Sequence, residues 1–89
     1  MIQLHLSPGF KRLLPQCDYS LEATTLNDVY TWIWQNHPVL RPILFAADSQ
    51  QIKPFVCVMR NHKQVDYNDL DLMLNKGDSL EIILPMSGG

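Results

Sequence analysis

The sequence predicts an α+β fold in which one main helix packs on one face of a mixed sheet of about four to five strands. Three observations support this: an N-terminal stretch that alternates apolar and polar residues, one capped amphipathic helix, and apolar segments of strand-like composition nearer the C-terminus. The 89 residues allow one domain with a single core. We expect that domain over residues 1–85, followed by a flexible tail over residues 86–89.

The first two strands are expected to form a hairpin with a wide connecting loop. Residues 2–6 alternate apolar and polar side chains, which is the period of a half-buried strand, and residues 18–23 read as the second strand. Between them, Ser7-Pro8-Gly9 ends the first strand and Pro15 closes the connecting segment.

The main helix is predicted over Leu26–Asn36. Thr25 is a suitable N-cap, and Asp28 stands three residues later, where its carboxylate can form the reciprocal hydrogen bond of a capping box. A negative charge at this position also interacts favourably with the positive end of the helix dipole. The residue before Pro38 is pushed out of the α region, so the helix ends there. Its apolar residues at helical spacing are expected to face the sheet.

A strand is predicted at the apolar run of residues 55–59. The preceding stretch, residues 39–52, has no clear pattern, and only residues 48–51 are interpreted as a solvated loop. Asn61-His62 makes a turn that lets residues 64–65 pair back.

The last strand is predicted over residues 79–84, after an irregular or short helical crossover at residues 67–74. Gly77 supplies a positive φ to the Lys76-Gly77-Asp78 turn before the strand. The order strand, strand, helix, strand, short strand, strand is that of a β-grasp.

Composition excludes several classes of function. The net charge is −2 and the seven basic residues are scattered, so we expect no nucleic-acid binding. No apolar run approaches the ~20 residues of a membrane span, and the N-terminus lacks the apolar region of a signal peptide, so we expect no membrane association and a cytoplasmic location.

The histidines, cysteines and loop acids are not expected to form a metal site or a catalytic site. His5, His37 and His62 lack metal-site spacing, and His5 is expected on a polar strand face. Cys17 and Cys57 are interpreted as small packed residues without a nearby base. The loop acids are interpreted as solvated; they are Asp66, Asp69, Asp71 and Asp78.

The candidate reactive group is the carboxylate of Gly89. Pro85 interrupts strand pairing, and four residues after it can extend about 13–14 Å at roughly 3.3–3.6 Å each. Ser87 and Gly88 would give the carboxylate access to a narrow channel in another protein. The ionised carboxylate can attack the α-phosphate of ATP, and a sulfur nucleophile can then displace AMP. The sequence has no glycine-rich phosphate loop, so a partner must bind the ATP.

Residues 76–89, KGDSLEIILPMSGG, resemble the C-terminal segment of the ThiS/MoaD family of ubiquitin-like sulfur carriers: a Gly-Asp turn, an apolar strand, a proline and a final Gly-Gly. The resemblance implies a ubiquitin-like β-grasp and no enzymatic activity or bound cofactor of its own. It implies adenylation of Gly89 by an E1-like activating enzyme, loading of sulfur as a thiocarboxylate, and delivery to a sulfur-accepting synthase.

The N-terminal strand lacks the pattern common in molybdopterin synthase small subunits, so the pathway stays open among cysteine, molybdopterin, thiamine and siderophore synthesis. A modifier joined to lysines through Gly89 and an inert β-grasp subunit remain alternatives.

A docking surface is predicted beside the tail. Glu81 marks the wet face of the last strand, so Ile83 is expected to be exposed. The register of the family that the sequence resembles implies that Val56 and Val58 point to the core, while Phe55, Cys57 and Met59 point outward. We predict partner contacts by Phe55, Cys57, Met59, Ile83, Pro85 and Met86. The alternative is that the run at residues 55–59 is buried on both faces.

Overall fold

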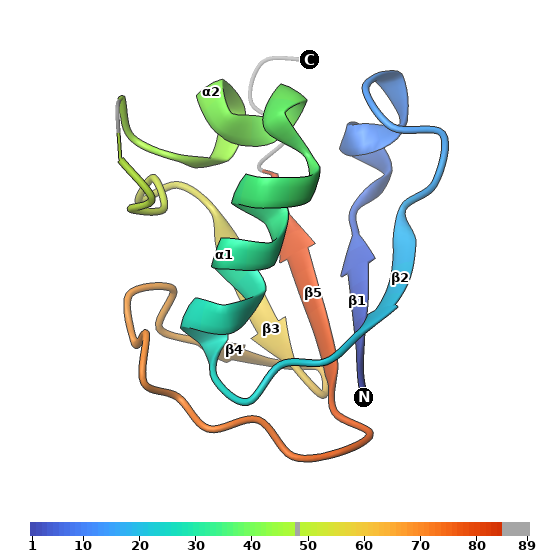
Figure 1. Ribbon diagram of the computed structural model, residues 1–89, viewed down its shortest axis with the longest axis vertical. Coiled ribbons are helices and arrows are strands. Elements are labelled where there is room, and N and C mark those ends of the chain that lie inside the picture. The colour runs from blue at the N-terminus through green and yellow to red at the C-terminus, as the bar shows by residue number, and fades with distance from the viewer. Residues whose placement is uncertain (48, 85–89) are drawn as a thin grey trace.

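The structure is a computed structural model that describes residues 1–47 and 49–84. It contains a five-stranded mixed sheet in the order β2-β1-β5-β3-β4. The strands are β1 (Ile2–Leu6), β2 (Asp18–Leu21), β3 (Cys57–Arg60), β4 (Lys63–Val65) and β5 (Ser79–Ile83). The last strand, β5, is central: it runs parallel to β1 and antiparallel to β3. Helix α1 lies across one face of the sheet and leaves the other face open (Figure 1), which confirms the predicted fold.

Helix α1 (Leu26–Asn36) has the predicted bounds because its end signals are local. The backbone N–H of Asp28 donates to the Thr25 hydroxyl, and the Asp28 carboxylate accepts the Thr25 N–H, so the capping box is complete. The helix turns its apolar side chains to the sheet, where they are buried: Leu26, Val29, Tyr30 and Ile33.

The segment between α1 and β3 contains short helical elements that the sequence did not predict. It contains the 3-10 turn η2 (Pro38–Leu40) and the short helix α2 (Arg41–Leu44), followed by a bridge between Phe45 and Ile52. Pro42 is accommodated because it lies in the first turn of α2, where no N–H is needed. Five of the described side chains of this segment are buried in the core: Leu40, Leu44, Phe45, Ile52 and Val56.

Several strand limits also differ from prediction. β2 ends at Leu21, and β3 begins at Cys57, because Phe55 lies in a turn in which the Val56 N–H donates to the Lys53 carbonyl, 3.1 Å away. β5 ends at Ile83, one residue before the predicted end. The connection over residues 67–74 is irregular, which was one of the two structures predicted for it. The 3-10 turn η1 (Pro8–Arg12) joins β1 to β2.

The core lies between the covered sheet face and the helical layer. Alternate residues of β1 and β5 are buried there, among them Leu4, Leu80 and Ile82. Across residues 1–47 and 49–84, no helix has both the length and the apolar character needed to cross a bilayer.

Candidate functional site

The candidate site is the C-terminal end of β5 and the sheet face beside it. The predicted tail residues lie outside the described residues: Pro85, Met86, Ser87, Gly88 and Gly89. What the structure describes is therefore the platform from which the tail departs. β5 points toward the end of the molecule at which η1 and α2 lie (Figure 1).

The Gly-Asp turn fixes the start of β5 against the N-terminus. Gly77 adopts a φ of +88°, so the glycine is needed for its backbone conformation; a Cβ there would meet nothing within 4 Å. The Gly77 N–H donates to the Met1 carbonyl at 3.0 Å, and the Gln3 N–H donates to the Asp78 carbonyl at 2.8 Å. These bonds set the parallel register between β1 and β5.

Asp78 corrects the sequence interpretation, because it is a buried structural acid and not a solvated one. Its carboxylate accepts the Asn75 N–H at 2.8 Å and the Asn61 side-chain amide at 3.0 Å. The side-chain oxygen of Asn61, Oδ1, in turn accepts the Ser79 N–H at 2.9 Å. Donation from the Asn75 backbone, and then from Asn61, lowers the pKa of Asp78. This lock ties the β3–β4 turn to the first residue of β5.

The turn that carries Asn61 has a demanding backbone. Asn61 and His62 have φ values of +50° and +69°, which is the geometry of a two-residue hairpin turn with positive φ at both positions. Asparagine tolerates this region better than most residues, and here its side chain also reaches β5. The sequence indicated the turn but not the contact with Asp78, which lies 17 residues away.

Ser7 holds the other end of β5. The Ser7 N–H donates to the Ile82 carbonyl at 3.0 Å, and the Leu84 N–H donates to the Ser7 hydroxyl at 3.3 Å. Leu84 is half-buried against the core. The sequence analysis saw Ser7 only as a strand break, so this anchor at the base of the tail was missed; no local pattern predicts it.

The predicted docking residues on β3 and β5 lie on the open face. Cys57 pairs with Ile83, and Met59 pairs with Glu81. All four side chains are partly exposed, whereas the alternating residues Val58 and Ile82 are buried on the covered face. The prediction for Val56 and Val58 is confirmed, and burial of the run on both faces is wrong.

Phe55 is exposed as predicted, but from the turn before β3 and not from the strand itself. The Lys53 ammonium lies 5.8 Å from the centroid of its ring.

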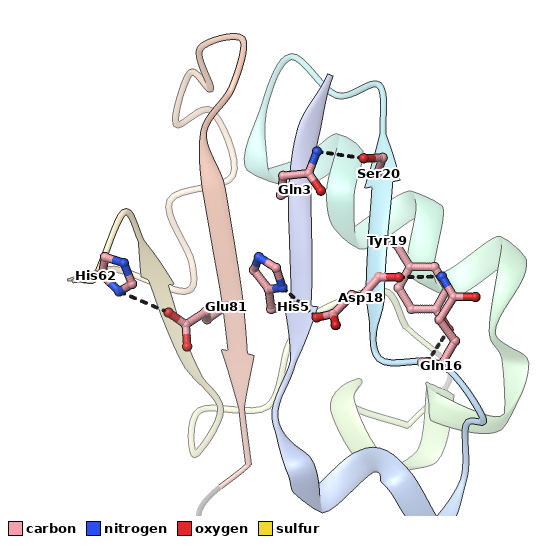
Figure 2. A network of polar contacts seen from close by, with 8 residues as sticks. All are labelled: Gln3, His5, Gln16, Asp18, Tyr19, Ser20, His62 and Glu81. Carbon is pink, nitrogen blue, oxygen red and sulfur yellow. Dashed lines mark hydrogen bonds and ion pairs between the residues drawn. The ribbon is translucent and has the colours of Figure 1, made fainter.

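The same face carries a set of polar contacts between strands (Figure 2). His5 Nδ1 lies 2.6 Å from Asp18 Oδ1, and His62 Nδ1 lies 3.5 Å from Glu81 Oε1. His5 is thus a polar face residue, as predicted. The pairing of each acid with a histidine depends on strand register, and the sequence analysis did not find it.

His37 is the C-cap residue of α1, and its side chain is partly buried. Its ring centroid lies 5.1 Å from the centroids of both Tyr19 and Trp32. Its Nε2 is buried and has no hydrogen-bond partner within the described part of the chain. Burial lowers the pKa of His37. Both cysteines are free thiols, and residues 1–47 and 49–84 contain no cluster of three or more His, Cys, Asp or Glu suited to a metal ion.

Solved structures of similar fold span this whole architecture. SAMP1 from Haloferax volcanii shares 21% identity at a TM-score of 0.82, with 99% of this chain and 98% of that chain covered. CysO from Mycobacterium tuberculosis shares 20% identity at a TM-score of 0.73, with 92% of this chain and 96% of that chain covered. Urm1 from Trypanosoma brucei shares 26% identity at a TM-score of 0.73, with 99% of this chain and 94% of that chain covered.

No curated protein matches the sequence. The model of the ThiS family matches residues 16–89, a stretch that includes α1, the Asn61–Asp78 lock and β5. This ubiquitin-like β-grasp, with its central last strand, therefore belongs to the ThiS family.

Proposed function

We propose that the chain is a sulfur carrier whose Gly89 carboxylate is adenylated and then converted to a thiocarboxylate. The observation that carries the proposal is the placement of β5. This strand is the central one of the sheet, is fixed at its start by Asp78 and at its end by Ser7, and is followed in the sequence by Leu84 and then Pro-Met-Ser-Gly-Gly. Membership of the ThiS family supports the same proposal.

The chemistry takes two steps. A Gly89 carboxylate oxygen attacks the α-phosphorus of ATP and releases pyrophosphate, which leaves an acyl-adenylate. Hydrosulfide, or a donor of equivalent sulfur, attacks the acyl carbon and releases AMP, which leaves the thiocarboxylate. An α-carboxyl has an ordinary pKa of about 3.3–3.7, so the nucleophile of the first step is ionised at neutral pH.

Partner proteins supply the rest of this chemistry. An E1-like activating enzyme binds ATP and the tail, and a synthase accepts the sulfur. The carrier itself acts as a protein substrate and holds no cofactor. The acceptor belongs to cysteine, molybdopterin, thiamine or siderophore synthesis.

The open face beside the tail is the proposed docking surface. Cys57, Met59 and Ile83 provide partly exposed apolar surface on β3 and β5, and Phe55 adds an exposed ring in the preceding turn. Pro85 and Met86, which follow in the sequence, are proposed as further partner contacts. Apolar surface that is contiguous and exposed commonly marks a protein interaction site.

Conjugation to target lysines through Gly89 is the second candidate. The similarity to a small archaeal modifier protein favours it. Both functions use the same adenylate, and they differ in the nucleophile that displaces AMP, which is sulfur for a carrier and a lysine amine for a modifier.

Intact-mass spectrometry separates the candidates. The chain is incubated with ATP, hydrosulfide and the E1-like enzyme of its own organism. A carrier gains mass equal to one replacement of oxygen by sulfur, and the gain requires ATP. A modifier instead appears in lysine-linked adducts when lysate proteins are added. A chain that shows neither product is the inert β-grasp subunit, and the proposal is then wrong.

A further inference from the structure

The strand residues that project from the open sheet face include negatively charged side chains but no lysine or arginine. Strand register and alternation identify the side chains that project from it, because the alternating residues on each strand are directed to the core. The projecting side chains are Gln3, His5, Asp18, Ser20, Cys57, Met59, Gln64, Ser79, Glu81 and Ile83. This set includes two carboxylates but no lysine or arginine.

The two basic residues within strands belong to the opposite face. Arg60 pairs with Leu80, whose side chain is buried in the core, and Lys63 pairs with Arg60. Residues that pair directly opposite one another in neighbouring strands have their side chains on the same face of the sheet. In agreement with this, Arg60 Nη1 donates a hydrogen bond to the Met73 carbonyl on the covered side. The remaining basic residues lie outside the strands: Lys11, Arg12, Arg41, Lys53 and Lys76.

The two carboxylates stand in one row across the sheet. His5 pairs with Asp18 on one side and with Glu81 on the other, so the acids are separated by a single strand. Two strand spacings of ~4.8 Å place their positions about 10 Å apart. Histidines contact both carboxylates, as Figure 2 shows, and Asp18 and Glu81 remain 78% and 34% exposed.

This acidic row adjoins the apolar surface near the tail. Glu81 lies two residues before Ile83 on β5, and Met59 pairs directly with Glu81. A partner that covers Ile83 and Cys57 while receiving the tail therefore also meets Glu81, and a broader partner meets Asp18.

We propose that the open face docks the activating enzyme through two cationic side chains of that enzyme, which contact Glu81 and Asp18 in the row next to the apolar contact at Ile83. Arginine suits this role best because its guanidinium can bind a carboxylate in two parallel hydrogen bonds. The inference rests on the proposed function and adds to it the charge that the partner must present. Charges at the edge of an interface mainly set the association rate and the orientation of docking.

The test measures binding of the chain to the E1-like activating enzyme of its own organism by biolayer interferometry at low and high salt. Glu81→Gln and Asp18→Asn should each weaken binding by about two- to fivefold at low salt, the range of an exposed ion pair. Glu81→Lys should weaken it by about tenfold or more, because it places like charges together. Each loss should shrink at high salt, because salt screens exposed charges.

Asp69→Asn is the matched control. It removes the same charge from an exposed loop residue outside the strands, whose backbone bonds lie within residues 66–72. It should leave binding within about twofold, since a change of net charge alone acts weakly. Melting curves should show that the two neutral variants, Glu81→Gln and Asp18→Asn, fold like the wild type.

Equal effects of Glu81→Gln and Asp69→Asn, or tighter binding by Glu81→Lys, would overturn the inference. Failure of the wild-type chain to bind the enzyme would overturn it as well. Binding with the expected charge dependence, but without a sulfur-dependent mass gain, would overturn the proposed sulfur-carrier function while upholding the charged docking surface.

Discussion

Replacement of Asp78 by alanine should destabilise the domain far more than its place in a loop suggests. The change removes the acceptor of the Asn75 N–H and of the Asn61 side-chain amide. Hydrogen bonds to a charged group contribute about 1.5–3 kcal/mol each, and water can partly replace them at the exposed Asn61 and Asn75, so we expect a total loss of about 2–3 kcal/mol.

That loss is a large part of the stability of a chain of this length, about 4–13 kcal/mol. It corresponds to a fall in Tm of about 10–20 °C, measured by circular dichroism. Asp71→Ala is the control, because Asp71 is an exposed loop acid whose carboxylate has no hydrogen-bond partner within residues 1–47 and 49–84. The reasoning would be refuted if the two variants melted within about 2 °C of each other.

The pH dependence of stability provides a second measurement on the same residue. The pKa of Asp78 is lowered from its ordinary value of 3.8, so the unfolded chain binds the proton more readily than the folded chain. The contribution of Asp78 is therefore complete above pH 3.8 and is lost as pH falls through the lowered folded value. Asp78→Asn should show a weaker loss of stability in that acid range than the wild type does.

Three further predictions concern other parts of the molecule. His37→Phe should reduce the loss of stability as pH falls below 6.5, since burial lowers the pKa of His37; an NMR titration that gives His37 a pKa above 6.5 would contradict this. Ile83→Ala should weaken binding to the activating enzyme while costing at most about 1 kcal/mol of stability, whereas Ile82→Ala, at a fully buried position, should cost about 2–5 kcal/mol; equal losses in urea unfolding would place Ile83 in the core. Tyr30→Phe should cost about 1 kcal/mol, because the Tyr30 hydroxyl donates to the Tyr67 carbonyl at 2.6 Å; an unchanged urea midpoint would show that this bond adds nothing.

The elements with local end signals were predictable from the sequence. Helix α1 was located to the residue because Thr25, Asp28 and Pro38 act on their immediate neighbours. The need for glycine at position 77 was equally local, since it depends on a positive φ in a tight turn.

The features that depend on distant residues were not predictable in this way. Helix α2 has only four residues, and its Leu44 is buried in the core that the sheet and α1 also form. Asp78 looked like a solvated acid, because its partner Asn61 lies 17 residues away. The placement of Asp18 and Glu81 on either side of His5 likewise follows from strand register. Alternation along a single strand does not define that register.

The claim that Gly89 provides the reactive carboxylate is tested most directly by locating the sulfur within the loaded chain. The wild type and a variant with one alanine appended after Gly89 are each incubated with ATP, hydrosulfide and the activating enzyme, and then fragmented in a mass spectrometer. The account predicts that sulfur replaces oxygen on Gly89 of the wild type and that the extended chain stays unloaded. Sulfur on any other residue, or equal loading of the extended chain, would contradict it.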